Sequence, residues 1–266
     1  MSRTIKLLIS IVVGICIFCA VSYSFREYWL GSFIIYAVSS AEDRNNLTAK
    51  PEKYELIKTQ TEQCVAHTAY GYKMCLPWDD VQYQNTDDLI SLIKFDRKAA
   101  IVIYNPDIEG NLRSDLIENF FEYDSNKAFS SFKLNNKYFE DFKSIADTTL
   151  EANSYTFFEK TLNSTFENYS FFTNFKEVYP QMMLLMSKIR VCRLSPGIYS
   201  DKILSFHINK LKGFQINFPE KNEISFHYLY IFPNDNENIK LTVVGGKNII
   251  RQNDIDLLIK SIVKLK

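Results

Sequence analysis

Glycine and histidine are scarce in this sequence, and their scarcity argues against several kinds of site. Only 8 of the 266 residues are glycines and only 3 are histidines. Phosphate-binding loops and dinucleotide folds need glycine where the backbone approaches the ligand closely, and Gly245-Gly246 is too short to form such a loop. No G-x-S-x-G motif, no pair of C-x-x-C motifs and no H-x-x-x-H spacing is present. The sequence therefore predicts no nucleotide, metal or other cofactor.

Net charge is also absent, because 31 lysines and arginines balance 31 aspartates and glutamates. A nucleic-acid-binding protein would show a basic excess or a basic stripe, so nucleic acid is not an expected partner. Aromatic residues are abundant instead, with 21 phenylalanines and 16 tyrosines. Exposed aromatic side chains anchor protein interfaces well, which favours a protein or an envelope component as the partner.

One long run without charge lies near the N-terminus. Leu7–Phe25 contains 19 residues and no charged side chain, which is enough for a helix to cross a hydrocarbon core of about 30 Å. Arg3 and Lys6 precede the run, and this charge placement favours an N-terminus inside the cytoplasm. We therefore expect a single membrane anchor over residues 1–28 and a C-terminal domain outside the cytoplasm. A cleaved signal peptide, which would release a secreted protein, is the alternative.

The next segment, residues 29–53, is expected to be a juxtamembrane stretch and a tether. Trp29–Val38 is apolar but too short to span a bilayer. Ala41–Pro51 is polar and contains Asn-Asn and proline, which are typical of loops. Residues 54–266 then remain for one domain, which is long enough to enclose a sizeable core.

The pattern of apolar residues in this domain predicts strands, then helices, then strands again. Strands are predicted over Gln63–Thr68, Tyr72–Leu76, Leu89–Phe95 and Ala99–Tyr104, and again within residues 203–243 as a meander. Helical spacing marks residues 112–121, 138–146 and 175–189, which form a helical insert over about 107–193. A last helix is expected to begin at Asn253, with Asp256 as its capping carboxylate. This order predicts an α+β fold in which helices pack on an antiparallel-dominated sheet, preceded by one N-terminal transmembrane helix.

Cys64 and Cys75 flank the turn of the first predicted hairpin. A turn centred on Ala69-Tyr70 would place the two residues opposite each other. Directly opposed cysteines can approach closely enough for a disulfide, and such a bond requires an oxidising compartment. The alternative is a pair of reduced thiols, in which case His67 and Cys75 become a candidate dyad.

His207 and His227 are the remaining candidates for a polar site. Each is alone in its predicted strand, and the two imidazoles would approach each other only if those strands are neighbours. Together with a loop carboxylate from Asp79-Asp80 or Asp87-Asp88 they could form a dispersed acid–base site. The other interpretation is that both are ordinary polar residues on a sheet surface.

Both ends of the domain resemble those of a known family. Gly71–Trp78 (GYKMCLPW) is similar to the strand that runs into Pro-Trp in PsbP/Mog1-like domains, and Ile239–Lys264 is similar to their closing strand, loop and isoleucine-rich helix. The resemblance implies an α/β/α sandwich with a binding or assembly role, and it transfers no site residues. The sequence thus predicts a membrane-anchored, extracytoplasmic binding or assembly module. An envelope enzyme with a dispersed site and a secreted binding protein are the alternatives.

Overall fold

The computed structural model describes residues 3–24, 41–57, 64–107, 154–166, 175–221, 223–235, 237–246 and 248–265. Its centre is an eight-stranded sheet with the strand order β1-β9-β10-β11-β12-β6-β5-β4. Only β1 and β9 pair in parallel, and the other neighbours are antiparallel. The expected mixed fold with an antiparallel-dominated sheet is therefore confirmed.

The large sheet consists of β1 (Pro51–Lys53), β4 (Val81–Thr86), β5 (Ile90–Phe95), β6 (Ala99–Tyr104), β9 (Lys202–Ile208), β10 (Leu211–Lys221), β11 (Ile224–Phe232) and β12 (Ile239–Gly246). Two smaller sheets have the orders β13-β3-β2 and β7-β8, with β2 (Val65–Ala69), β3 (Tyr72–Leu76), β7 (Arg193–Ser195), β8 (Ile198–Tyr199) and β13 (Val263–Lys264). The described helices are α1 (Arg3–Ser24), α3 (Ala41–Asn46), α6 (Ser154–Asn163), α7 (Phe175–Cys192) and α8 (Gln252–Lys260).

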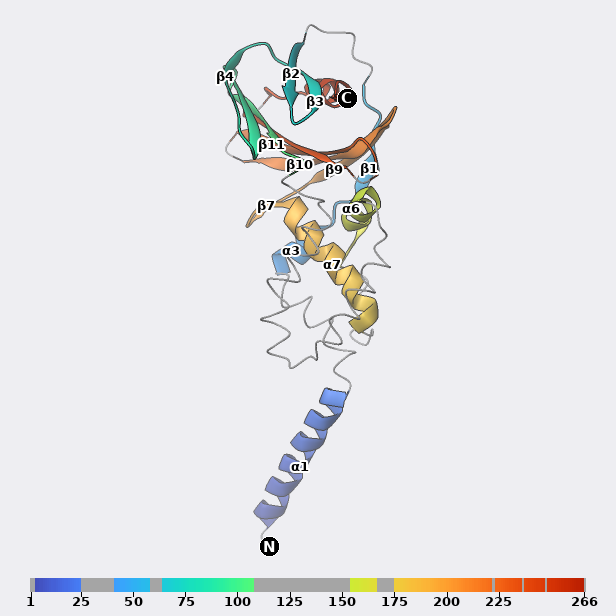
Figure 1. The fold of residues 1–266 in the computed structure, drawn as a ribbon. Helices are drawn as coiled ribbons and strands as arrows, with labels where there is room; N and C mark the ends of the chain where they lie inside the picture. The colour runs from blue at the N-terminus through green and yellow to red at the C-terminus, as the bar shows by residue number, and fades with distance from the viewer. Residues whose placement is uncertain are drawn as a thin grey trace.

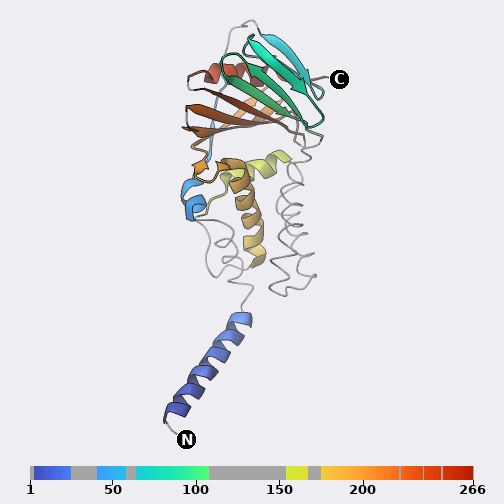
Figure 2. The same ribbon diagram turned by 90° about the vertical axis from the view of Figure 1, so that its left-hand side faces the viewer.

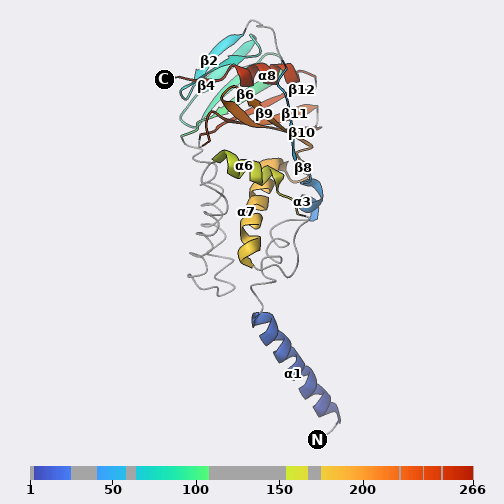
Figure 3. The ribbon, with the colours of Figure 1, turned by 90° about the vertical axis from the view of Figure 1, so that its right-hand side faces the viewer.

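The large sheet is covered on both faces (Figures 1 and 3). One face packs against α8 and the β13-β3-β2 sheet, and the other packs against α6 and α7. Side chains alternate between the faces along each strand, so β11 sends Leu229 to the α8 side and Tyr230 to the α6 side. Figure 2 shows α6 lying along the sheet and α7 running away from it.

The first hairpin turns at Tyr70 and Gly71, both of which have positive φ angles of 49° and 76°. Two left-handed residues form the tight turn whose twist matches antiparallel strands. The turn is therefore centred one residue later than the sequence suggested, and Ala66 rather than Cys64 lies opposite Cys75.

Helix α8 begins at Gln252 and is capped by a different carboxylate from the one expected. The backbone N–H of Arg251 donates to Asp254 Oδ2 at 2.9 Å. Asp256, which the sequence suggested as the cap, is instead fully buried on the inner side of the helix. The prediction that Asp256 caps the helix was wrong by two residues, because Arg251 rather than Asn253 is the N-cap.

The predicted tether over residues 29–53 contains ordered parts of the fold. Asp43 in α3 and Leu47 are each 2% exposed, and β1 is the edge strand beside β9. The polar composition of this stretch concealed its packing, since Leu47 is the one large apolar residue within Ala41–Lys50. Tether and domain therefore do not divide at residue 53.

The helical insert is described in part. Its α6 and α7 form the lower layer of the fold, whereas the helices expected at 112–121 and 138–146 lie outside the described residues. Strand β4 was not expected, because apolar and polar residues alternate only over the first four positions of its sequence VQYQNT. The strand Ala99–Tyr104 is fully buried on one face and half-buried on the other.

Helix α1 contains 22 residues, and its side chains are described for residues 11–21. Over the described residues, no helix combines the length and the apolar character needed to cross a membrane.

Candidate functional site

A pocket of about 380 Å³ lies where β1, β9 and α6 meet. Its polar lining brings His207 together with two carboxylates, Glu55 and Glu159. His207 is on β9, Glu55 follows β1, and Glu159 is on α6. The lining consists of Lys53, Tyr54, Glu55, Tyr155, Glu159, Ser205, Phe206 and His207.

Tyr155 forms a rigid wall of this pocket. Its ring stacks on Phe214 with centroids 5.5 Å apart, and Lys212 Nζ lies 3.8 Å from its ring centroid. Lys212 in turn forms an ion pair with Asp235. Burial, and the charge and hydrogen bond of Glu159, raise the pKa of Tyr155 to about 12. The phenol therefore remains protonated and donates to Glu159 Oε1 at 3.5 Å.

The volume and the lining suit a small polar ligand. Ligand pockets commonly measure roughly 300–1,000 Å³, so this one lies near the lower limit. Glu55 and Glu159 can accept hydrogen bonds from hydroxyl or ammonium groups, and an imidazole can either donate or accept. His207 can be singled out from the sequence but the two carboxylates cannot, because the three residues come from segments far apart in the chain and share no local motif.

The structure does not bring His207 and His227 together. Strand β10 separates their strands, and His227 lies opposite Asn217, which lies opposite Lys202. Residues at odd and even positions of β9 face opposite sides of the sheet. His207 therefore faces the α6 side, whereas Lys202 and His227 face the α8 side. The paired-histidine hypothesis required neighbouring strands, and this condition is not met.

His227 belongs to a hydrogen-bonded cluster beneath α8, which we call the Asp256 network. It comprises Tyr54, Gln215, Asn217, His227, Gln252 and Asp256. Asp256 Oδ2 accepts from the Tyr54 hydroxyl at 2.9 Å and from the Ile57 N–H at 2.8 Å. Gln252 Nε2 donates to Asp256 Oδ1 at 2.9 Å. The hydrogen bond to Asp256 and burial raise the pKa of Tyr54 to about 12, burial being the larger cause.

The far end of the network holds His227 as a neutral imidazole. His227 Nδ1 lies 2.9 Å from Asn217 Oδ1, which also accepts from Gln215 Nε2 at 2.8 Å. Since an amide oxygen only accepts, Nδ1 carries the proton. Burial lowers the pKa of His227 to about 4.

We expect this shift to make the domain less stable in weak acid. The unfolded chain takes up a proton near pH 6.5 but folded His227 does so only near 4. The contribution of neutral His227 to the free energy of unfolding is therefore fully present above about pH 6.5, and it decreases by up to about 3 kcal/mol as the pH falls to 4. Denaturation curves of the native protein and of His227→Gln across this range measure the contribution. A pKa near 6.5 for His227 in the folded protein would contradict this prediction.

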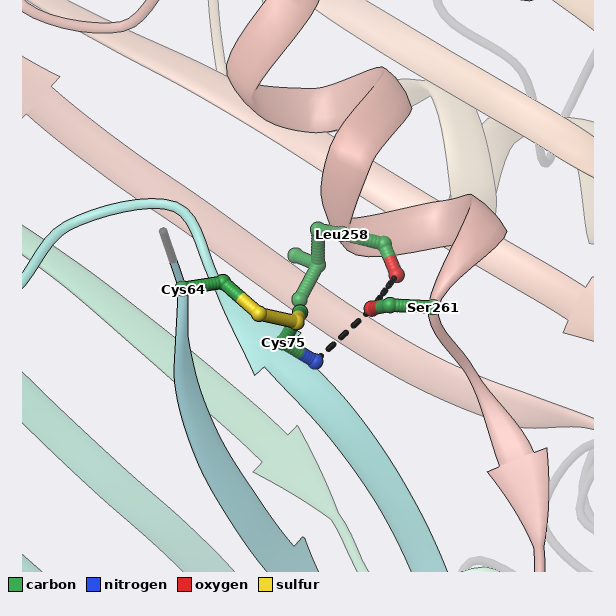
Figure 4. The surroundings of a disulfide bond; sticks show 4 residues. All are labelled: Cys64, Cys75, Leu258 and Ser261. Carbon is green, nitrogen blue, oxygen red and sulfur yellow. Dashed lines mark hydrogen bonds between the residues drawn. A yellow bond between two sulfur atoms is a disulfide. The ribbon is translucent and has the colours of Figure 1, made fainter. Parts of the chain in front are cut away.

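The Cys64–Cys75 pair forms a disulfide in the structure, with Cα atoms 5.4 Å apart. Figure 4 shows how this bond is tied to α8: the Cys75 N–H donates to Ser261 Oγ at 2.7 Å, and that hydroxyl donates to the Leu258 carbonyl at 2.8 Å. The disulfide thus holds the β2–β3 hairpin where it also contacts the end of the helix. His67 does not pair with Cys75, since its Nε2 lies 3.3 Å from Ser91 Oγ.

Buried charges lie between α3 and α7, where they serve the fold. Asp43 Oδ1 accepts from Arg193 at 2.8 Å and from the Tyr199 hydroxyl at 2.9 Å. The fully buried Lys188 donates to the carbonyls of Ala49 and Ser164 at 2.9 and 2.8 Å. Burial lowers the pKa of Lys188. These contacts join α3, α6 and α7 beneath the sheet.

Within the part of the chain that the structure describes, no three His, Cys, Asp or Glu side chains form a group that could hold a metal ion. Comparisons with protein-family models, with curated proteins and with solved structures found no match to this chain.

Proposed function

We propose that this protein is an extracytoplasmic binding module held at a membrane by α1. The observation that carries this proposal is the exposure of apolar side chains all around α1. Their exposed fractions range from 49% to 72% for Ile11, Val12, Val13, Ile15, Ile17, Phe18 and Val21. At 100° per residue these positions surround the helix rather than form a stripe. A helix that is apolar on every side belongs in a protein core or a membrane.

The sequence supplies the length that a membrane anchor needs. The uncharged run Leu7–Phe25 has 19 residues and extends beyond the described side chains at both ends. As a helix it would be about 28 Å long, close to the thickness of the hydrocarbon core. Arg3 and Lys6 before the run favour a cytoplasmic N-terminus, which leaves the domain on the other side.

The hairpin disulfide supports the same compartment. Disulfides persist in oxidising environments and are rare in the cytoplasm. Two accessible features support a binding role. One is the pocket beside His207, and the other is the exposed strand β4.

Protease treatment of intact spheroplasts that express the full chain tests the proposal. We expect the domain to be digested from outside, and Cys64 and Cys75 to resist a maleimide reagent until they are reduced. We expect Val12→Lys combined with Ile15→Lys to move the protein out of the membrane fraction. A matched pair of lysines on exposed positions of the domain, Thr68→Lys with Glu52→Lys, should leave it there.

Two results would contradict the proposal. A domain that is protected until the membrane is broken would face the cytoplasm. A mature chain that has lost about 20–40 residues, as signal peptidase cleavage produces, would be a secreted protein rather than an anchored one.

A further inference from the structure

The two edges of the large sheet differ in how well they are protected against an added strand. The β1 edge is only 3 residues long and consists of a proline and two charged residues, Glu52 and Lys53. Short length, proline and charge are the usual devices that prevent edge-to-edge pairing. The β4 edge, at the rim of the sheet in Figure 1, has 6 residues with neither charge nor proline.

Strand β4 is open to solvent along its whole length. All 6 of its residues are exposed, including Tyr83 at 49% and Val81 at 36%. Its pairing with β5 is irregular only between Val81 and Tyr83, so Tyr83–Thr86 form a regular stretch. In an antiparallel pair the backbone groups of alternate residues point away from the neighbouring strand. An edge of this kind presents a row of donors and acceptors to an incoming strand.

Negative charge lies at both ends of this uncharged strand. Asp79 and Asp80 precede it, and Arg97 lies 2.8 Å from Asp80 and 3.9 Å from Asp79. Asp79 remains 88% exposed. Asp87 and Asp88 follow the strand and are also exposed. Asp87 Oδ1 accepts from the N–H groups of Leu89 and Ile90, which hold the pKa of this carboxyl below its usual value.

This arrangement disfavours a second copy of the chain as the occupant. In antiparallel pairing of two β4 strands, Asp79-Asp80 of one copy would approach Asp87-Asp88 of the other. Like charges placed opposite each other across strands are destabilising. A strand that carries positive charge at both ends would instead be attracted by the acidic pair at each end of β4.

We propose that the β4 edge binds an extended segment of a partner protein, which adds a further strand to the sheet and carries basic residues at both ends of an uncharged stretch. Backbone hydrogen bonds provide the affinity in this mode of recognition. The charged ends set the register and the preference for a basic partner. The inference deepens the binding role proposed above and rests on it.

Defined peptides test the proposal on the full chain in detergent micelles. The probe is fluorescein-labelled KKTVTVTVKK, and its matched control is EETVTVTVEE. We expect the basic peptide to bind more than about tenfold more tightly than the acidic one, as charge complementarity requires. Affinity should fall as salt increases. Hydrogen exchange of residues 81–86 should slow when the basic peptide binds.

Variants and a modified peptide separate the two parts of the proposal. Asp79→Asn with Asp88→Asn should weaken binding about fivefold, since both charges are exposed. Glu52→Gln at the opposite edge should leave binding unchanged. The basic peptide N-methylated at alternate residues cannot complete the ladder and should bind at least about tenfold more weakly.

Several outcomes would overturn the proposal. These are equal binding of the two peptides, no binding of either, and exchange protection away from residues 81–86. If protection of β4 from hydrogen exchange increases with protein concentration in the absence of peptide, the β4 strands of two copies pair with each other instead. The assay is independent of topology. If the basic peptide binds but the domain proves to face the cytoplasm, only the proposed compartment is contradicted. If the peptide does not bind and the domain faces outside, only the proposed β4 binding surface is contradicted.

Discussion

Replacing Phe158 by alanine is expected to lower the free energy of unfolding by about 4 kcal/mol. Phe158 on α6 is 0% exposed. Its ring centroid lies 4.5 Å from that of Tyr230, 5.5 Å from Phe214 and 5.8 Å from Phe232. Alanine would leave a cavity between the helix and the sheet, and the rigid aromatic neighbours could fill it only in part. The loss combines the lost burial of the ring with the cost of that cavity.

Chemical denaturation of the full chain in detergent measures this effect. Trp78 provides a spectroscopic signal for the domain, because it packs in the opposite core with its ring 4.9 Å from Phe95. Glu159, the exposed neighbour of Phe158, supplies a control. We expect Glu159→Ala to change the free energy of unfolding by less than about 0.5 kcal/mol. A loss below about 1 kcal/mol for Phe158→Ala would mean that α6 does not pack on the sheet as described.

Replacing Asp256 by alanine is expected to destabilise the domain by about 4 kcal/mol, because it removes three hydrogen bonds to a buried carboxylate, each of which contributes about 1.5 kcal/mol. The carboxylate is 0% exposed and accepts from Tyr54, from the Ile57 backbone and from Gln252. These bonds connect the chain after β1 to α8. Tyr54 and Ile57 lie 202 and 199 positions before Asp256 in the sequence. The effect is therefore expected to include release of residues 54–57.

Two further variants distinguish the network from the helix itself. Asp254→Ala removes the exposed cap at the start of α8 and should cost only about 1 kcal/mol. Tyr54→Phe removes one donor and should cost about 1–2 kcal/mol. Hydrogen exchange at Ile57 should quicken in Asp256→Ala but not in Asp254→Ala. Equal stability of the two aspartate variants would contradict the central role of Asp256.

Strong local patterns in the sequence were sufficient to predict much of the sheet. The alternation along residues 203–243 and the apolar run Ala99–Tyr104 correctly indicated strands, and a period near 3.6 indicated α7 and α8. These predictions hold because side-chain periodicity is set by backbone geometry within one element. Where the local pattern is weak, as in β4 and α3, packing partners far along the chain decide the structure.

The candidate site was much less predictable than the strands. His207 stands out in the sequence only as one of 3 histidines. Its pocket depends on Glu55, which follows a parallel edge strand, and on Glu159, which lies in the helical insert. The separation of His207 and His227 likewise depends on strand order and on register, and a register shift of one residue moves a strand's side chains to the opposite face.

The sequence alone determined the uncharged run at the N-terminus, the mixed α+β character and the hairpin that carries Cys64 and Cys75. All three depend on neighbours in the chain, so composition and spacing suffice. Only the tertiary structure decided that Asp256 is buried, that His227 faces away from His207, and that β4 lies at an unprotected edge between two acidic pairs. These features arise from contacts between distant segments, where small differences in packing energy choose among many arrangements that the same local patterns allow.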